Sequence, residues 1–355
     1  MDRNSRLLSL AALAVALYPA LPLLDWAAEA LTGAPLQLER HILSTLIFAL
    51  LTLALYLQVG QAGMVQLGIA AFFALGAFGS GVLTVEKYPM QLGFWGALLL
   101  VPPACALVGA CLSGPCAGLQ GDYLAMVTLA FGELTRVVLL NMEAITDGSR
   151  GLNPLPVPAL PEFFLRHLSG PGQMHAAFLA LYYTALWAVV LVYLCCRALG
   201  RAPLGRAFGA LRQDALACAS LGLSPNRLRL LAFAAGAGIA GLAGVLYATY
   251  LTTTAEPSNY DFNLSTMVLC AAILGGLDSP KGAILGATVL IGFDNLIAPG
   301  IATLLGRLGD AADPGLWGTF SSWRLMIFGL ALIALMRLRP QGIWPEQDAG
   351  RRGAP

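Results

Sequence analysis

The sequence predicts an all-α membrane protein, a polytopic bundle of about eight to ten transmembrane helices. The first reason is composition: of 355 residues, 58% are apolar and 11% are charged, and the mean hydropathy is +0.74. Soluble domains carry about 25% charged residues, so this chain lacks the charge to cover a surface that faces water. The second reason is that the apolar residues gather in long runs along the whole chain.

These runs approach the length of about 20 residues that crosses a bilayer. They fall at 7–24, 41–59, 64–84, 93–113, 121–141, 176–196, 228–250, 263–277, 282–299 and 321–338. The runs at 121–141, 263–277 and 282–299 are short, polar or broken by glycine, so eight full spans with re-entrant segments are an alternative. The first run follows two arginines, as a signal peptide would, but the many later spans favour an uncleaved helix.

Arginine clusters predict the orientation, because short cytoplasmic loops are enriched in Lys and Arg. The largest cluster comprises Arg197, Arg201, Arg206, Arg212, Arg227 and Arg229, and a second comprises Arg337, Arg339, Arg351 and Arg352. Segment 142–175 is acidic and rich in proline. We therefore expect both termini and the loop 200–228 inside, and 142–175 outside.

Several kinds of function are not expected. The balance of 20 Lys+Arg against 19 Asp+Glu shows no bias toward nucleic acid. Seven cysteines without CxxC spacing and three histidines without a metal-binding pattern predict no metal or cofactor. There is no phosphate-binding loop and no nucleophile elbow, so we expect a non-enzyme whose nucleotide site, if one drives it, lies on another chain.

Polar residues inside the apolar runs are candidates for function, since each is costly in hydrocarbon. Glu133 and Arg136 are three residues apart and share one helical face. They form either a structural ion pair or a polar wall along a substrate route. Gln58, Gln61 and Gln66 lie among glycines, which indicates a helix break lined by polar groups, with interhelical hydrogen bonding as the alternative.

Two other patterns concern packing and partners. Gly236, Ala240 and Gly244 recur every four residues and predict close approach of another helix. Within the basic loop, the apolar positions have the spacing of one face of a short helix that could lie on the membrane or insert into a soluble partner. These positions are Phe208, Leu211, Ala215, Cys218 and Leu221.

Segments distributed over most of the chain resemble, in order, the LivM-like permease subunits of branched-chain amino acid ABC importers. They are Gly121–Glu133 with Arg136, Ile145–Asn153, Gly205–Asp214 with Ala219–Gly222, Ala232–Tyr247, Leu274–Ala283 and Arg339–Gly342. The resemblance rests on the succession of these segments in the family's order.

The resemblance implies an ABC-importer permease fold, with residues 1–340 as the transmembrane domain and 341–355 as a cytoplasmic tail. It implies one of two permease subunits in the bacterial inner membrane, served by two cytoplasmic ATPases and a periplasmic amino acid-binding protein. The loop 205–222 then resembles the element that docks into an ATPase. The docking residues it implies are Arg206, Ala207, Arg212, Asp214, Leu221 and Gly222. We expect Gln61, Gln66, Glu133 and Arg136 to line or gate the route.

The chain departs from the family pattern at a few positions. Gln213 and Ala215 stand where glutamate is frequent, Asp147 where glycine is common, and Gln66 and Ile69 where smaller polar residues or histidine are often found. The last departure affects the pathway itself. Branched-chain or other hydrophobic amino acids are the expected cargo, with a urea or short-amide importer as the alternative. An ion-coupled secondary transporter is the competing class.

Overall fold

The computed structural model describes residues 38–116, 118–119, 121–158 and 171–293, with residues 329, 330, 333, 337, 342 and 343. These residues form helices, turns and loops, and no strand occurs among them. The expected span 7–24 lies outside the described residues, as does most of 321–338.

The larger helices follow one another along the chain as α3 (Leu38–Leu55), α4 (Ile69–Thr84), α5 (Gly93–Cys116), α6 (Asp122–Asn141), α9 (Pro171–Arg201), α10 (Pro203–Gln213), α12 (Pro225–Leu251), α13 (Phe262–Gly275) and α14 (Pro280–Gly292). The shorter ones are the π-helix η2 (Tyr56–Gln61), α7 (Glu143–Thr146), α11 (Ala215–Ser220), and the 3-10 turns η3 (Gly148–Arg150) and η4 (Pro257–Asn259).

Five described helices are long and apolar enough to cross a membrane: Glu39–Gln61, Gly93–Cys116, Asp122–Asn141, Ala176–Arg201 and Pro225–Leu251. They confirm the helical spans predicted near 41–59, 93–113, 121–141, 176–196 and 228–250. The prediction of a span from residue 64 was wrong at its start, because residues 62–68 are not helical and α4 begins at Ile69. Helix α14 spans Pro280–Gly292 within the predicted run 282–299, and residues 294–299 of that run lie outside the described residues.

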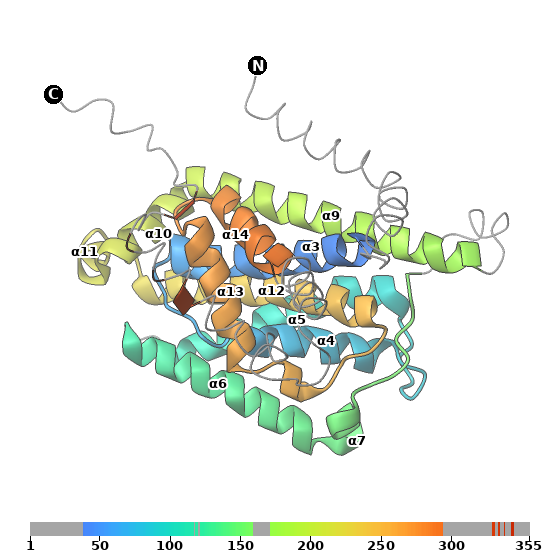
Figure 1. Ribbon diagram of the computed structural model, residues 1–355. Coiled ribbons are helices and arrows are strands. Elements are labelled where there is room, and N and C mark those ends of the chain that lie inside the picture. The colour runs from blue at the N-terminus through green and yellow to red at the C-terminus, as the bar shows by residue number, and fades with distance from the viewer. Residues whose placement is uncertain are drawn as a thin grey trace, which may run out of the picture.

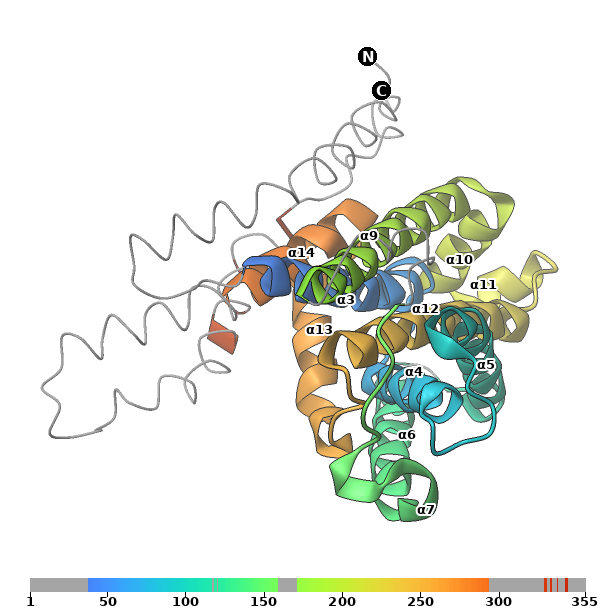
Figure 2. The same cartoon turned by 90° about the vertical axis from the view of Figure 1, so that its right-hand side faces the viewer.

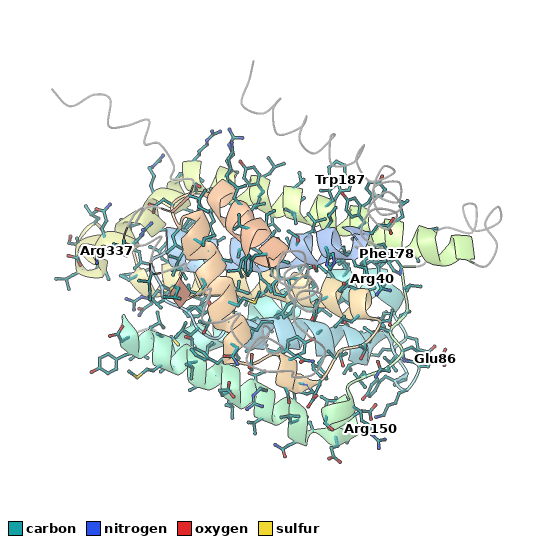
Figure 3. The ribbon with its side chains drawn as sticks, viewed as in Figure 1. Arg40, Glu86, Arg150, Phe178, Trp187 and Arg337 are labelled. Carbon is teal, nitrogen blue, oxygen red and sulfur yellow. The ribbon has the colours of Figure 1, made fainter. Side chains whose placement is uncertain are left out.

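The helices lie in layers, with α9 on one side of the bundle, α6 on the opposite side, and α3, α12 and α4 between them (Figures 1 and 2). One end of the bundle carries α10 and α11, and the other carries α7 (Figure 1). The labelled residues Glu86 and Arg150 lie at the α7 end, whereas Arg337 lies at the α10–α11 end (Figure 3). Segment 142–158 and the basic loop are therefore at opposite ends.

Small residues bring α12 into contact with its neighbours. A Cβ atom on Gly244 would lie 2.2 Å from the Phe73 carbonyl oxygen, and one on Gly76 would lie 2.3 Å from that of Gly241. Gly236 lies against Gln58, where a Cβ atom would meet the Gln58 amide carbon at 2.3 Å. These contacts confirm the predicted packing role of the glycine stripe, since only glycine permits such approach.

The described part of segment 142–175 is more ordered than a simple loop. After α7 and η3 the chain runs extended, and the Leu155 N–H donates to the Thr252 carbonyl (3.0 Å) while the Thr254 N–H donates to that of Leu152 (3.2 Å). Leu152 is fully buried. Helix α9 begins at Pro171, within the last residues of the predicted segment 142–175. The described part of 142–175 therefore braces the bundle through the residues that follow α12.

Candidate functional site

The helix that begins at Leu38 is broken in its second half. It widens into a π-turn over Tyr56–Gln61, and residues 62–68 then run without helical structure. The N–H groups of Ala62, Gly63 and Met64 still reach back to the carbonyls of Leu57, Val59 and Gln58, at 3.3, 3.1 and 3.0 Å. The helix break predicted from clustered glutamine and glycine is confirmed. Non-helical backbone inside a membrane is tolerated only against protein or water.

The three glutamines of this break differ in their bonding. The Gln58 amide nitrogen donates to the Phe233 carbonyl (3.3 Å), and that of Gln61 donates to the Tyr56 hydroxyl (3.1 Å) and the Cys196 carbonyl (3.2 Å). Gln66 is fully buried and neither polar atom of its amide has a partner. Gln58 and Gln61 therefore connect the break to α12 and α9 by hydrogen bonds. The amide of Gln66 makes no hydrogen bond.

Unpartnered polar atoms are concentrated in this segment. Among the described residues, the buried side-chain nitrogen and oxygen atoms without a partner all belong to Gln58, Gln61 and Gln66. Each such atom costs about 1–3 kcal/mol relative to a bonded one. Folded proteins keep few of them, and one explanation is a site that receives water or a polar ligand.

Helices α6 and α13 hold the far side of the break. The Leu67 N–H donates to the Thr128 hydroxyl at 3.1 Å, and the Ala70 N–H donates to the Ser265 hydroxyl at 3.1 Å. Gly68 is packed so closely on α6 that a Cβ atom would lie 2.1 Å from the Thr128 carbonyl oxygen. Buried hydroxyls thus take the place of the missing helical carbonyls at the start of α4.

The predicted pair on α6 is present. The Arg136 Nε atom lies 2.9 Å from the Glu133 carboxylate, and the side chains are 28% and 37% exposed, respectively. Glu133 also lies beside the break, in a closely packed region that includes Leu67, Asp261 and Ser265. The structure therefore brings Glu133 to the break.

The basic loop forms two helices, so the prediction of one continuous amphipathic helix was wrong. Asp214 separates α10 from α11 in an extended conformation (φ −156°, ψ 118°), and its carboxylate accepts the Leu216 N–H at 2.7 Å. An aspartate at this position caps the second helix and so favours a break before it.

Three of the five positions of the apolar stripe in this loop face the chain's own core. Phe208, Leu211 and Cys218 are buried, and so is Ala207. Outward-facing apolar surface comes instead from Leu221, which is 75% exposed, and from Leu216, which is 83% exposed. Arg206, Asp214 and Gly222 are exposed as well. Sequence reasoning missed Leu216, because it lies outside the periodic stripe on which the prediction rested.

Arg212 turns back toward the bundle. Its Nη1 atom donates to the Gly60 carbonyl at 2.6 Å and to the Asp278 carboxylate at 2.8 Å. Beside it, a cavity of about 260 Å³ opens between the break, the start of α6 and the loop, lined among others by Gly63, Gly121, Asp214 and Arg229. No sequence signal links residues 60, 212 and 278, so these contacts could not be foreseen.

At the α7 end, an ion pair joins two loops. The Lys87 Nζ atom lies 2.5 Å from the Asp147 carboxylate, and the Tyr88 hydroxyl donates to the Ile145 carbonyl. The hydrogen bond to Asp147 raises the pKa of Lys87 above its ordinary value.

Comparison with known proteins gives consistent results. The family described as "Branched-chain amino acid transport system / permease component" matches residues 37–336. The chain is 35% identical to the high-affinity branched-chain amino acid transport system permease protein LivM of Salmonella typhimurium and to that of Escherichia coli K12, over 85% of this chain and 68% of each relative. It is 24% identical to the permease protein LivH of Salmonella typhimurium, over 68% of this chain and 79% of that protein. No solved structure matches significantly.

Proposed function

Since this chain belongs to the branched-chain amino acid transport permease family, we propose that it is a translocation subunit of an ATP-driven importer of branched-chain or other hydrophobic amino acids. It is a multi-pass helical protein of the inner membrane, and in our proposal both termini face the cytoplasm. The relatives named LivM and LivH support a second permease subunit beside this one. Two ATPases and a periplasmic amino acid-binding protein complete the assembly we propose.

The observation that carries the route is the polar break next to α6. A fully buried amide without partners, that of Gln66, lies in the break next to Leu67, whose N–H donates to Thr128 of α6. The same helix carries the partly exposed Glu133–Arg136 pair. Charged groups in a transmembrane helix are costly against lipid and normally face a bundle interior or a hydrated cavity. We therefore place the route along the face shared by α6, the break and the start of α13. Gln66, Glu133 and Arg136 line it in this proposal.

Gln61 has a different place in this scheme. Its amide nitrogen is already bonded to α9 and to Tyr56, while its oxygen is unpartnered. In our proposal Gln61 holds the cytoplasmic edge of the break and offers one acceptor to the route.

The docking surface we propose is the exposed part of α10–α11. Arg206 and Asp214 supply charge, Leu216 and Leu221 supply apolar contact, and Gly222 ends the surface with a positive φ of 79°. An amphipathic helix that inserts apolar anchors into a partner groove is a common recognition mode. Ala207 is buried and supports this surface from beneath.

Uptake of labelled leucine and of labelled urea, by vesicles carrying the complete importer, tests the proposal. We expect ATP-dependent leucine uptake that excess isoleucine or valine inhibits and urea does not. The variant Gln66→Leu should fold and assemble but reduce uptake. Thr288→Ala, an exposed change on α14 outside both the route and the docking surface, should not reduce it. Urea uptake without leucine uptake would select the short-amide importer instead.

A further inference from the structure

Three segments far apart in the sequence meet at one arginine. Arg212 stands in the last turn of α10, Gly60 in the π-turn η2, and Asp278 in the turn between α13 and α14. The arginine Nη1 atom is 2.6 Å from the Gly60 oxygen and 2.8 Å from the Asp278 carboxylate. One guanidinium therefore joins the docking helices to the helix break and to the α13–α14 turn.

The bond to Gly60 has a defined structural effect. The last carbonyls of a helix lack intrahelical partners, and a positive side chain that binds them also favours the negative end of the helix dipole. The carbonyls of Leu57, Gln58 and Val59 accept hydrogen bonds from the backbone N–H groups of residues 62–64. The Gly60 carbonyl instead accepts its hydrogen bond from the Arg212 side chain. Arg212 thus caps the broken helix from another segment.

Close packing makes this contact stiff. A Cβ atom on Gly63, whose φ is +70°, would lie 2.7 Å from the Arg212 Cγ atom, and one on Gly60 would lie 2.2 Å from the Leu277 carbonyl oxygen. Nothing fits between the arginine, the break and the turn. Displacement of the end of α10 must move these segments or break the hydrogen bonds.

The turn is also held from its other side. The Ile343 N–H donates to the Leu274 carbonyl at 3.0 Å, and a Cβ atom on Gly342 would lie 2.5 Å from the Gly276 Cα atom. By contrast, the Arg212 and Asp278 side chains are 43% and 51% exposed. Ion pairs with such exposure are weak and screened, so the bond to the Gly60 carbonyl and the close packing carry most of the contact.

We propose that Arg212 is a positioning residue that transmits movement of the ATPase-docking helices α10–α11 to the helix break at Gly60–Gly68. The inference rests on the proposed function, because it takes α10–α11 to be the docking element. It assigns Arg212 to coupling within the chain, and no longer to contact with the ATPase.

The first test measures coupling in the complete, reconstituted importer. Variants Arg212→Gln, Arg212→Lys and Asp278→Asn are compared with Arg227→Gln, an exposed arginine at the same end that lies outside the contact. We expect Arg212→Gln to retain the ATPases and to hydrolyse ATP at a rate near that of the unchanged chain. Amino acid transported per ATP should fall about tenfold, within the usual range of coupling between sites. Arg212→Lys keeps a positive donor group, so its amount of amino acid transported per ATP should lie between that of Arg212→Gln and that of the unchanged chain.

Three results would overturn the inference. Loss of the ATPases from Arg212→Gln would make Arg212 a docking contact. Equal losses of hydrolysis and uptake, at an unchanged ratio, would indicate a merely structural role. If neither the amount of amino acid transported per ATP nor the rates of hydrolysis and uptake change, the contact transmits no movement. If the unchanged importer fails to transport any amino acid, it is the proposed function that fails.

A second test needs neither ATPases nor substrate. Amide hydrogen exchange in the purified chain should be faster at residues 62–64 in Arg212→Gln than in Arg227→Gln, because the cap on the broken helix is lost. Equal exchange in the two variants would show that Arg212 does not hold the break, and would overturn the inference whatever the cargo is.

Discussion

The α3–α4–α12 region and the α6 side of the bundle are both helical and apolar, yet they are built differently. In the most apolar 18-residue stretch of the Glu39–Gln61 span, 78% is buried within the bundle. In the corresponding stretch of α6, only 22% is buried. Glycines bring the backbones of α4 and α12 into contact, whereas α6 exposes large side chains such as Tyr123, Met126 and Leu134. We infer that the first region is a fixed scaffold and that the α6 side is where lipid, partner and route meet.

The largest expected effect is on the scaffold. Gly244→Ala adds a Cβ atom that would lie 2.2 Å from the Phe73 carbonyl oxygen, which is far too close. Both groups belong to helical backbone, so neither can move easily. We expect destabilisation of about 1–3 kcal/mol, the usual cost of overpacking, seen as a lower unfolding temperature in detergent. Gly209→Ala is the matched control, because a Cβ atom there meets nothing within 4 Å. Equal behaviour of the two variants would contradict the fixed scaffold.

A second change addresses the docking surface that we propose on α10–α11. Leu216→Ser removes an apolar side chain that is 83% exposed and free of core packing. Burial of a leucine contributes about 1.5–3 kcal/mol, so we expect ATPase binding to weaken at least tenfold, with no change in the stability of the chain. Titration of purified ATPase onto the permease measures this. Asn226→Ala, exposed at the start of α12, should bind as the unchanged chain does.

A third change separates the two interpretations of the α6 pair. Glu133→Gln leaves Arg136 without its partner, and we expect leucine uptake to fall while the fold persists, since both side chains are partly exposed. The exchange Glu133→Arg with Arg136→Glu restores a pair in the opposite order. Recovered uptake would indicate simple charge compensation. Uptake that stays low would place Glu133 in contact with the cargo.

The smallest effect is expected at the opposite end. Lys87 and Asp147 are 41% and 40% exposed, so Lys87→Gln should leave the unfolding temperature unchanged. Because the pKa of Lys87 is raised, any stabilisation by the pair is fully present below the ordinary lysine pKa of about 10.4 and is lost only as pH rises through the raised value. Unfolding measured from pH 6 to 9 should therefore show no step that depends on Lys87.

The sequence supported much of this architecture for simple physical reasons. Apolar runs located the long helices, and glutamines beside glycines located the break, because both signals are local in the chain. The stripe in the basic loop was also seen, but not which way it faces: Phe208 and Cys218 pack inward, and Asp214 divides the helix. Periodicity identifies an apolar face and not what covers it.

Contacts between distant segments could not be predicted at all. Nothing in a single sequence connects Arg212 to the Gly60 carbonyl, since any backbone carbonyl is an acceptor and its availability depends on the π-turn. The same holds for the hydroxyls of Thr128 and Ser265, which complete the start of α4. Close approach of helices decides these bonds, and that is a property of the folded bundle.

The most direct measurement of the central claim is transport by purified components in sealed vesicles. This chain and its sister permease are reconstituted with or without the two ATPases, and labelled leucine uptake is followed with the binding protein outside and ATP inside. We predict uptake only when the ATPases and ATP are present. Leucine movement by the permease chains alone, driven by a proton or sodium gradient, would contradict the account.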